Sequence, residues 1–222
     1  MKIGHRHPEK LTRAQMAERV ANDVPAGAVV NLGIGIPTQV SNYLNPEHEI
    51  ILHTENGMLG MGPEAHGDDI DTDLLNAGKL PVTEAPGCSY FHHADSFAIM
   101  RGGHLDIAVL GAFQVSRNGD LANWHTGEPE AIPAVGGAMD LAVGAKDVFV
   151  IMELMTKTGT SKLVSDLTYP VTGLGCVTRV YTELAIFDLD RTGNVRVTET
   201  YGNVSVADLR DMTHLDLIDA TE

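Results

Sequence analysis

The segment Glu55-Asn56-Gly57 is the part of the sequence best suited to covalent chemistry. An apolar strand predicted over residues 49–54 ends directly before Glu55. Ligands of open α/β sheets bind at the carboxyl ends of strands, so Glu55 would face such a ligand. A carboxylate there can act as a nucleophile, a base or a ligand anchor. The spacing alone leaves open a fourth possibility, a solvated acid at the end of a strand.

A glycine turn, Gly33-x-Gly35, follows a second apolar strand predicted over residues 28–32. Backbone N–H groups at such a turn can bind an anion where a helix begins. A dinucleotide fingerprint would need a small residue at Thr38 and an acid near the position of Glu55. Three interpretations remain open: a turn without a ligand, a site for a non-nucleotide ligand, and a degenerate dinucleotide site.

A glycine pair, Gly136-Gly137, opens a later apolar segment. Paired backbone N–H groups at the start of a helix can stabilise an oxyanion, although a plain tight turn has the same pattern. Lys157 and Lys162 follow a predicted strand. They either steer an anionic ligand or solvate a loop.

Metal and thiol chemistry have weaker support. The histidines of His92-His93-x-Asp95 are adjacent, so their side chains point in different directions and seldom share an ion. No base for Cys88 is identifiable, which favours a small buried thiol. We therefore predict no metal site and no permanently bound cofactor.

The elements that must position these residues alternate between strands and helices. Residues 12–24 carry an apolar stripe of helical period behind a capping box formed by Thr12 and Gln15. Residues 57–73 are rich in glycine and acids, which predicts a long loop. This alternation predicts an α/β fold with an open, mostly parallel sheet and helices on both faces. The other predicted elements are a helix over 37–44, strands over 106–115, 147–154, 177–183, 185–189 and 195–200, and a final helix over 205–212.

Length and charge exclude several classes of protein. The 222 residues are expected to form one domain over residues 1–222, with flexible tails at 1–11 and 216–222. Fifteen Lys and Arg against 30 Asp and Glu give a net charge of −15, which disfavours nucleic acid and anionic membranes as partners. Two cysteines, no signal-peptide pattern and no membrane-length apolar run indicate a cytoplasmic protein.

Taken together, the motifs resemble the B (β) subunit of the family I coenzyme A transferases, the 3-oxoacid and 3-oxoadipate enzymes. The resemblance extends from about Thr12 to Met212, and the order of the motifs around Glu-Asn-Gly is highly specific. The motifs that carry it are Asn31-Leu-Gly-Ile-Gly-Ile-Pro-Thr38, His53-Thr-Glu-Asn-Gly-Met-Leu-Gly-Met-Gly-Pro63, Ala94-Asp-Ser-Phe-Ala-Ile-Met-Arg-Gly-Gly-His-Leu-Asp106, Gly111-Ala-Phe-Gln-Val115, Gly119-Asp-Leu-Ala-Asn-Trp124 and Ala134-Val-Gly-Gly-Ala-Met-Asp-Leu141.

The resemblance implies a mechanism that the residue pattern alone does not reach. Glu55 matches the family's nucleophile, which attacks an acyl-CoA thioester and passes through a glutamyl-CoA thioester. Gly136 and Gly137 match the oxyanion contribution of this subunit. Asn56 and Gly57 are expected beside the substrate, and the Gly33 and Gly35 turn near the site. Coenzyme A is then a substrate, carried as an acyl thioester, and a carboxylic acid is the acceptor.

The resemblance also implies a partner, because the family places a glycine-rich CoA loop and another oxyanion donor on an A (α) subunit. We therefore expect a heterotetramer or a larger assembly. Thr54 replaces a frequent serine and Leu154 a frequent histidine, which leaves the acceptor acid open. The competing interpretations are an acyl-CoA hydrolase of the same fold, a nucleotide-binding or regulatory subunit, and a sugar-phosphate isomerase-like protein.

Overall fold

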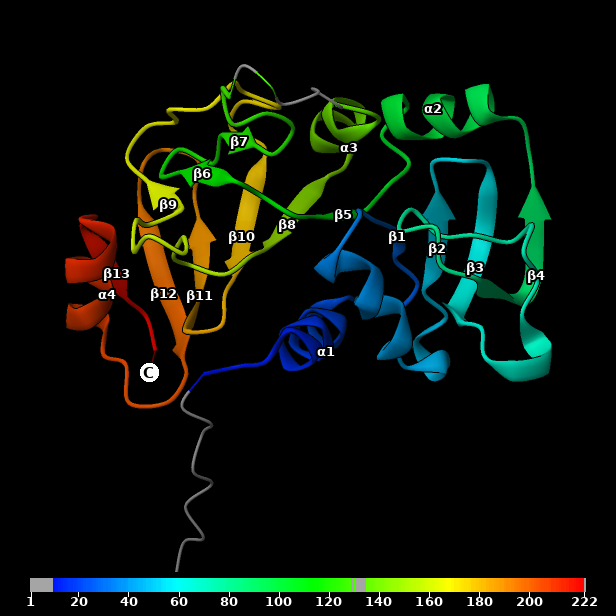
Figure 1. Ribbon diagram of the computed structural model, residues 1–222, viewed down its shortest axis with the longest axis horizontal. Coiled ribbons are helices and arrows are strands. Elements are labelled where there is room, and N and C mark those ends of the chain that lie inside the picture. Colours follow the sequence, from blue (N-terminus) through cyan, green and yellow to red (C-terminus); the bar gives the residue numbers. More distant parts are fainter. Residues whose placement is uncertain (1–9, 129, 131–134, 222) are drawn as a thin grey trace, which may run out of the picture.

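A ten-stranded sheet forms the centre of the molecule (Figure 1), and the computed structural model describes residues 10–128, 130 and 135–221. The strand order is β13-β12-β11-β10-β8-β5-β1-β2-β3-β4, and a separate three-stranded sheet has the order β7-β6-β9. The strands are β1 (Val29–Leu32), β2 (Ile51–Thr54), β3 (Met58–Glu64), β4 (Val82–Tyr90), β5 (Ile107–Leu110), β6 (Gln114–Ser116), β7 (Leu121–Ala122), β8 (Asp147–Ile151), β9 (Leu163–Val164), β10 (Val177–Tyr181), β11 (Ala185–Leu189), β12 (Val195–Thr200) and β13 (Leu217–Asp219).

The five central strands, β10, β8, β5, β1 and β2, run parallel. The antiparallel strands β3 and β4 extend one side, and β11 and β12 extend the other. From β1 the chain moves to β2 on one side and later to β5 on the opposite side. The order of the strands therefore reverses between β1 and β5, which opens a crevice at the carboxyl ends of these two strands.

Helices cover both faces of the sheet, as predicted. The α-helices are α1 (Arg13–Asp23), α2 (His93–Arg101), α3 (Ala138–Gly144) and α4 (Val206–Thr213), and the 3-10 helices are η1 (Ile36–Asn42), η2 (Pro46–His48) and η3 (Gly67–Asp69). Strand β5 shows how the faces alternate. Ile107 and Val109 pack in the core beneath α1 and η1, whereas Ala108 and Leu110 pack in the core beneath α2, α3 and α4. None of the helices in the described part of the chain has the length and apolar character that a membrane span requires.

The predicted helix ends agree with the structure. The Thr12 hydroxyl accepts from the backbone N–H of Gln15, and the Gln15 side chain accepts from the backbone N–H of Thr12. The stripe of α1 that the sequence marks as apolar includes Met16 and Val20, and both are fully buried. Ser205 and Asp208 form the same reciprocal cap at the start of α4. Local hydrogen bonding therefore sets both boundaries.

The prediction of a loop over residues 57–73 is wrong for residues 58–64, which form β3, whereas residues 65–73 contain no strand. Strand β3 pairs with β2 and with β4. A Cβ atom at Gly60 would lie 3.1 Å from the Cα of Cys88, and one at Gly62 would lie 2.4 Å from Thr83 Oγ1. These glycines permit close approach between two strands, so their presence does not indicate a loop.

Other boundaries differ in detail. The helix predicted over residues 37–44 is the 3-10 helix η1, and the strand predicted over 106–115 is interrupted between β5 and β6. The tail expected over residues 216–222 contains β13, which pairs in parallel with β12, and Leu217 is buried. Of the tail expected over residues 1–11, residues 1–9 lie outside the described part of the chain. The Leu11 N–H donates to the carbonyl of Glu183.

Candidate active site

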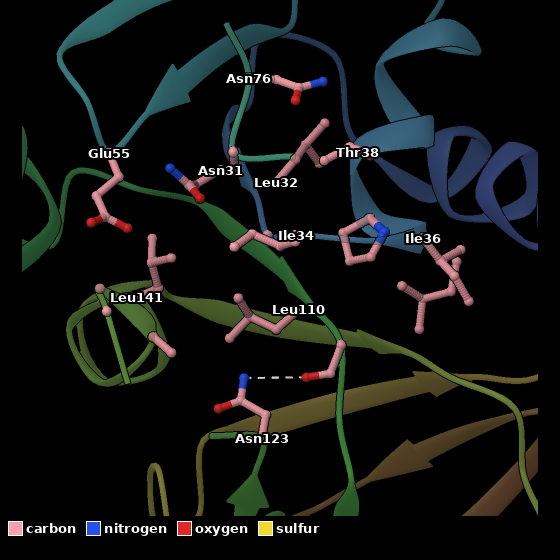
Figure 2. A pocket seen from close by; sticks show the side chains of 18 of the residues that line it. Asn31, Leu32, Ile34, Ile36, Thr38, Glu55, Asn76, Leu110, Asn123 and Leu141 are labelled. Atoms are coloured by element: carbon pink, nitrogen blue, oxygen red, sulfur yellow. Dashed lines mark hydrogen bonds between the residues drawn. The ribbon is translucent and has the colours of Figure 1, made fainter. Parts of the chain in front are cut away.

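A cavity of about 960 Å³ lies at the carboxyl ends of the central strands. It is lined by the residues that follow four of these strands: Gly33 after β1, Glu55 after β2, Gly111 after β5 and Met152 after β8. Figure 2 shows the Glu55 side chain at one end of this cavity, and it labels Asn31 and Ile34 among the other residues that line the cavity. The cavity therefore occupies the crevice that the reversal of strand order creates.

The turn that carries Glu55 is narrow and closely held. The backbone N–H of Met58 donates to Thr54 Oγ1 (3.0 Å), and the N–H of Gly57 donates to the Thr54 carbonyl (3.2 Å). Gly57 has a φ of +109°, and a Cβ atom there would lie 2.2 Å from the Phe91 carbonyl oxygen. Only glycine fits this position. The glycine of the Glu-Asn-Gly motif is thus required by the turn itself.

A buried polar network lies beneath the turn. Asn31 Nδ2 lies 2.9 Å from His53 Nδ1 and donates to the His53 carbonyl, while His53 Nε2 lies 3.0 Å from Ser96 Oγ. Ser96 Oγ donates to the Thr54 carbonyl (2.9 Å). Because the Ser96 proton is used there, His53 must donate from Nε2 and accept at Nδ1, which is the neutral form. Burial lowers the pKa of His53 to about 4, in agreement with that assignment.

The Glu55 carboxylate has a different neighbour at each oxygen. Oε1 lies 3.8 Å from Nε2 of His93, the first residue of α2. A Cβ atom at Gly137 would lie 2.6 Å from Oε2, so the carboxylate rests against bare backbone there. The Glu55 side chain is 39% exposed. Among the described residues its only ion-pair partner is this imidazole at 3.8 Å, so the partly solvated carboxylate keeps lone pairs available for attack on an electrophile.

The Gly33-x-Gly35 turn borders the same cavity. The Gly33 N–H donates to the Val109 carbonyl (2.8 Å), and a Cβ atom at Gly33 would lie 3.2 Å from that oxygen. Gly35 has a φ of +92°. The Thr38 hydroxyl, at the third position of a dinucleotide fingerprint, donates to the Gly35 carbonyl. It closes the turn, so this position does not offer the close backbone approach that a third glycine gives a dinucleotide.

The structure brings most of the sequence-predicted site residues together. Glu55, Asn56, Gly33 and both residues of the Gly136-Gly137 pair line the cavity, although Gly35 does not. Gly57 faces Phe91 and supports the turn from behind. The lysines differ as well, since Lys162 lines the cavity and Lys157 does not.

The position of His93 beside Glu55 was not predicted from the sequence. From the sequence, His93 was a candidate only for metal binding. The described residues hold no group of three or more His, Cys, Asp or Glu side chains that could bind a metal. His93 instead meets Glu55, which is distant in sequence. The one sequence feature that could have indicated a role for His93 is its position directly before the Ala94–Asp106 motif.

Cys88 lies on β4, is half-buried and does not line the cavity.

Comparisons with known proteins agree on one family. The sequence profile described as coenzyme A transferase matches residues 13–209. The B subunit of the 3-oxoadipate CoA-transferase of Acinetobacter baylyi is 56% identical over 96% of this chain and 98% of that protein. The B subunit of a probable succinyl-CoA:3-ketoacid coenzyme A transferase of Bacillus subtilis is 43% identical over 93% of this chain and 95% of that protein.

A solved structure supports the fold. The crystal structure of an acyl-CoA transferase from Escherichia coli O157:H7 superposes with a TM-score of 0.73 at 20% identity. The superposition covers 96% of this chain and 42% of the Escherichia coli chain. The likeness at this identity concerns the fold, and this chain spans less than half the length of that protein.

Proposed function

The chain belongs to the coenzyme A transferase family, and from this membership we propose that it is a B-type subunit that transfers coenzyme A between an acyl-CoA and a 3-oxoacid. Glu55 is the nucleophile in this proposal. One observation carries it: the Glu55 carboxylate stands in the cavity at the carboxyl ends of the central strands and rests against Gly137. Coenzyme A enters as a substrate, and the reaction needs no permanently bound cofactor.

The proposed reaction proceeds in two balanced halves. Glu55 attacks the thioester carbonyl of the acyl-CoA, which forms an acyl-glutamyl anhydride and releases the CoA thiolate. The thiolate then attacks the glutamyl carbonyl, which forms a glutamyl-CoA thioester and releases the donor acid as a carboxylate. The acceptor carboxylate repeats these steps in reverse and leaves as its CoA thioester. The anhydride keeps the acyl group activated, so no nucleotide triphosphate is consumed.

Each tetrahedral intermediate carries an oxyanion that needs a preorganised donor. We assign this role to the backbone at Gly136 and Gly137, with the Gly33 turn bordering the substrate. Close approach of Gly137 to Glu55 supports the assignment. Asn56 lines the cavity and donates from Nδ2 to the Leu75 carbonyl, which supports a place for it beside the substrate.

The acceptor proposed for this chain is a 3-oxoacid of the 3-oxoadipate type. Identity is 56% to the Acinetobacter baylyi 3-oxoadipate protein and 43% to the Bacillus subtilis 3-ketoacid protein. Both relatives are named as the B subunit of their enzyme, which supports an A-type partner. We propose that this A-type partner covers the Glu55 cavity in a heterotetramer or a larger assembly, because water would otherwise hydrolyse the glutamyl thioester.

The deciding experiment traps the intermediate. The chain is co-purified with its A-type partner, incubated with succinyl-CoA, reduced with borohydride and mapped by peptide mass spectrometry. We expect reduction of Glu55 alone, and transfer of CoA to 3-oxoadipate by the pair but not by the lone chain. An adduct on another residue contradicts the assignment of the nucleophile. Release of free CoA without transfer to any acid would instead favour an acyl-CoA hydrolase.

A further inference from the structure

The helix α2 holds the Glu55 turn from below and also presents a side chain to its carboxylate. Ser96 donates to the Thr54 carbonyl, one residue before Glu55 (2.9 Å). His93 precedes Ser96 by three residues, so both lie on one face of the helix. From there His93 Nε2 reaches to 3.8 Å from Glu55 Oε1. One rigid element therefore sets both the backbone and the side chain of the nucleophile.

The His93 ring is itself oriented by packing. It stands edge-on to the Phe97 ring, with centroids 5.0 Å apart and an interplanar angle of 90°. The Arg101 guanidinium lies over the Phe97 ring, 5.3 Å from its centroid. Edge-to-face aromatic pairs favour this geometry, so the imidazole has a preferred direction although its side chain is 59% exposed.

The two neighbours of the carboxylate are tied to each other. Arg101 Nε, at the end of α2, donates to Asp140 Oδ1 on α3 at 2.6 Å. Gly137 is the residue that precedes α3. The helix that carries His93 and the helix that follows Gly137 are thus joined by a hydrogen-bonded ion pair.

The carboxylate of a glutamate keeps one orientation only when both of its oxygens are in contact with neighbouring groups. The last torsion of the Glu side chain has a broad, nearly two-fold energy profile, so contact at one oxygen leaves the carboxylate plane free to rotate. Backbone at Gly137 restrains Oε2, and the only cationic or imidazole group within 4 Å of Oε1 among the described residues is His93. At 3.8 Å, Nε2 of His93 and Oε1 of Glu55 are in contact but not hydrogen-bonded, and contacts of this kind between catalytic groups often shorten when substrate binds.

We propose that His93 is a positioning residue for the nucleophile: its Nε2 holds Oε1 of Glu55 while Gly137 supports Oε2, and the carboxylate is thereby aimed at the thioester. This inference rests on the proposed function, in which Glu55 carries the intermediate. It assigns to His93 no proton transfer and no contact with coenzyme A. The effect is on the rate of forming the glutamyl thioester, with little effect on binding.

The test compares three variants of the assembled enzyme. Gln places its amide nitrogen about as far from the backbone as His Nε2, whereas Asn is one methylene shorter. His93→Gln and His93→Asn therefore differ in reach at the same exposed helix position. The matched control is His92→Asn at the neighbouring residue, where His92 Nδ1 accepts from the Ala94 N–H and Asn can replace it as a helix cap.

The readout is a single turnover with succinyl-CoA, quenched with borohydride, in which the amount of modified Glu55 is followed with time. We expect His93→Asn to slow thioester formation about tenfold, less than the roughly 10²-fold that a 1 Å misplacement can cost. KM for succinyl-CoA should stay within about twofold of wild type, since binding is unaffected in a positioning role. His93→Gln should recover most of the rate, and His92→Asn should match the wild type.

Three results would overturn the role of His93. These are an unchanged rate in His93→Asn, an equal loss in His93→Asn and His93→Gln, and an equal loss in His92→Asn. The second and third would mean that the helix start matters and the reach of the side chain does not. Failure of the wild-type complex to modify Glu55 at all would instead contradict the proposed function, so the two failures are distinguishable.

Discussion

Two carboxylates, one at the end of α1 and one after β2, are held in contrasting ways. Asp23, at the end of α1, accepts from Arg19 (2.5 Å), from Arg179 (3.0 Å) and from the Tyr181 hydroxyl (2.8 Å). Its side chain is 17% exposed. Glu55, at the end of β2, is 39% exposed and has one basic neighbour at 3.8 Å.

The surroundings of Asp23 and of Glu55 suit these two carboxylates to different roles. Around Asp23, burial and the Asp23 charge raise the pKa of Tyr181 above its ordinary value, and hydrogen bonding to Asp188 raises that of Arg179. Asp23 joins α1 to β10 through these contacts, and its carboxylate oxygens are occupied by hydrogen bonds. Glu55 is left with few partners, supported from below by uncharged groups. Asp23 therefore contributes to the packing of α1 on β10, whereas the Glu55 carboxylate keeps lone pairs available to a ligand in the cavity.

The largest effect is expected on removing the Glu55 carboxylate. In the assembled enzyme, Glu55→Gln keeps the shape of the side chain but cannot form the anhydride. We expect transfer to fall by at least about 10⁴-fold, or more than about 5 kcal/mol in transition-state free energy. The free energy of unfolding should stay within about 0.5 kcal/mol of wild type, as for a surface substitution. A steady-state transfer assay and a urea titration measure the two effects, and retained turnover contradicts the role of Glu55.

The opposite pattern is expected at Asp23. Asp23→Ala leaves Arg179 and Tyr181 without their shared acceptor, although Arg179 keeps its bond to Asp188. Breaking a buried ion pair costs about 3–5 kcal/mol, and partial exposure reduces the expected loss here to about 2–3 kcal/mol. Urea unfolding measures this loss. The transfer rate per folded complex should not change, and a large fall in that rate would erase the distinction between the two carboxylates.

Gly137→Ala adds one methyl group beside Glu55, the proposed nucleophile. The new Cβ atom would lie 2.6 Å from Glu55 Oε2, so the carboxylate must move. A displacement of about 1 Å predicts a loss of about 10²-fold in kcat. The matched control is Gly111→Ala in the same cavity, where a Cβ atom would meet only the Ile34 carbonyl oxygen at 4.0 Å. Equal kcat values for the two variants would contradict the close approach of Gly137.

Local patterns predicted those parts of the fold and site that depend on neighbours in sequence. The capping boxes at Thr12 and Ser205 are such cases, since all their partners lie within three residues. The apolar strand before Glu55 is another, and it led directly to the carboxyl edge of the sheet. The resemblance then supplied the proposed role of Glu55, which spacing alone left open among four possibilities.

Features that depend on long-range contact were not predictable in the same way. Gly60 and Gly62 resemble loop glycines until Cys88 and Thr83 are seen opposite them on β4. His93 meets Glu55 only because α2 docks across the end of β2. No periodicity or local motif encodes these pairings, which arise from the order of the strands.

The smallest expected effect concerns the uncharged support beneath Glu55. Burial lowers the pKa of His53 to about 4 from an ordinary value of 6.5. Below pH 6.5 the unfolded chain takes up a proton at His53 that the folded chain refuses, so stability falls as the pH decreases toward about 4. Between pH 7.5 and pH 5.0 this one group should cost about 2 kcal/mol of unfolding free energy, because each pKa unit is worth about 1.36 kcal/mol.

His53→Gln removes the titration, and its loss of unfolding free energy over the same interval, measured by urea titration, should be smaller by that amount. The other histidines contribute equally to both proteins and cancel in the difference. Equal losses in the two proteins would mean that His53 accepts a proton in the folded state, and that the support of the nucleophile is charged, as at Asp23.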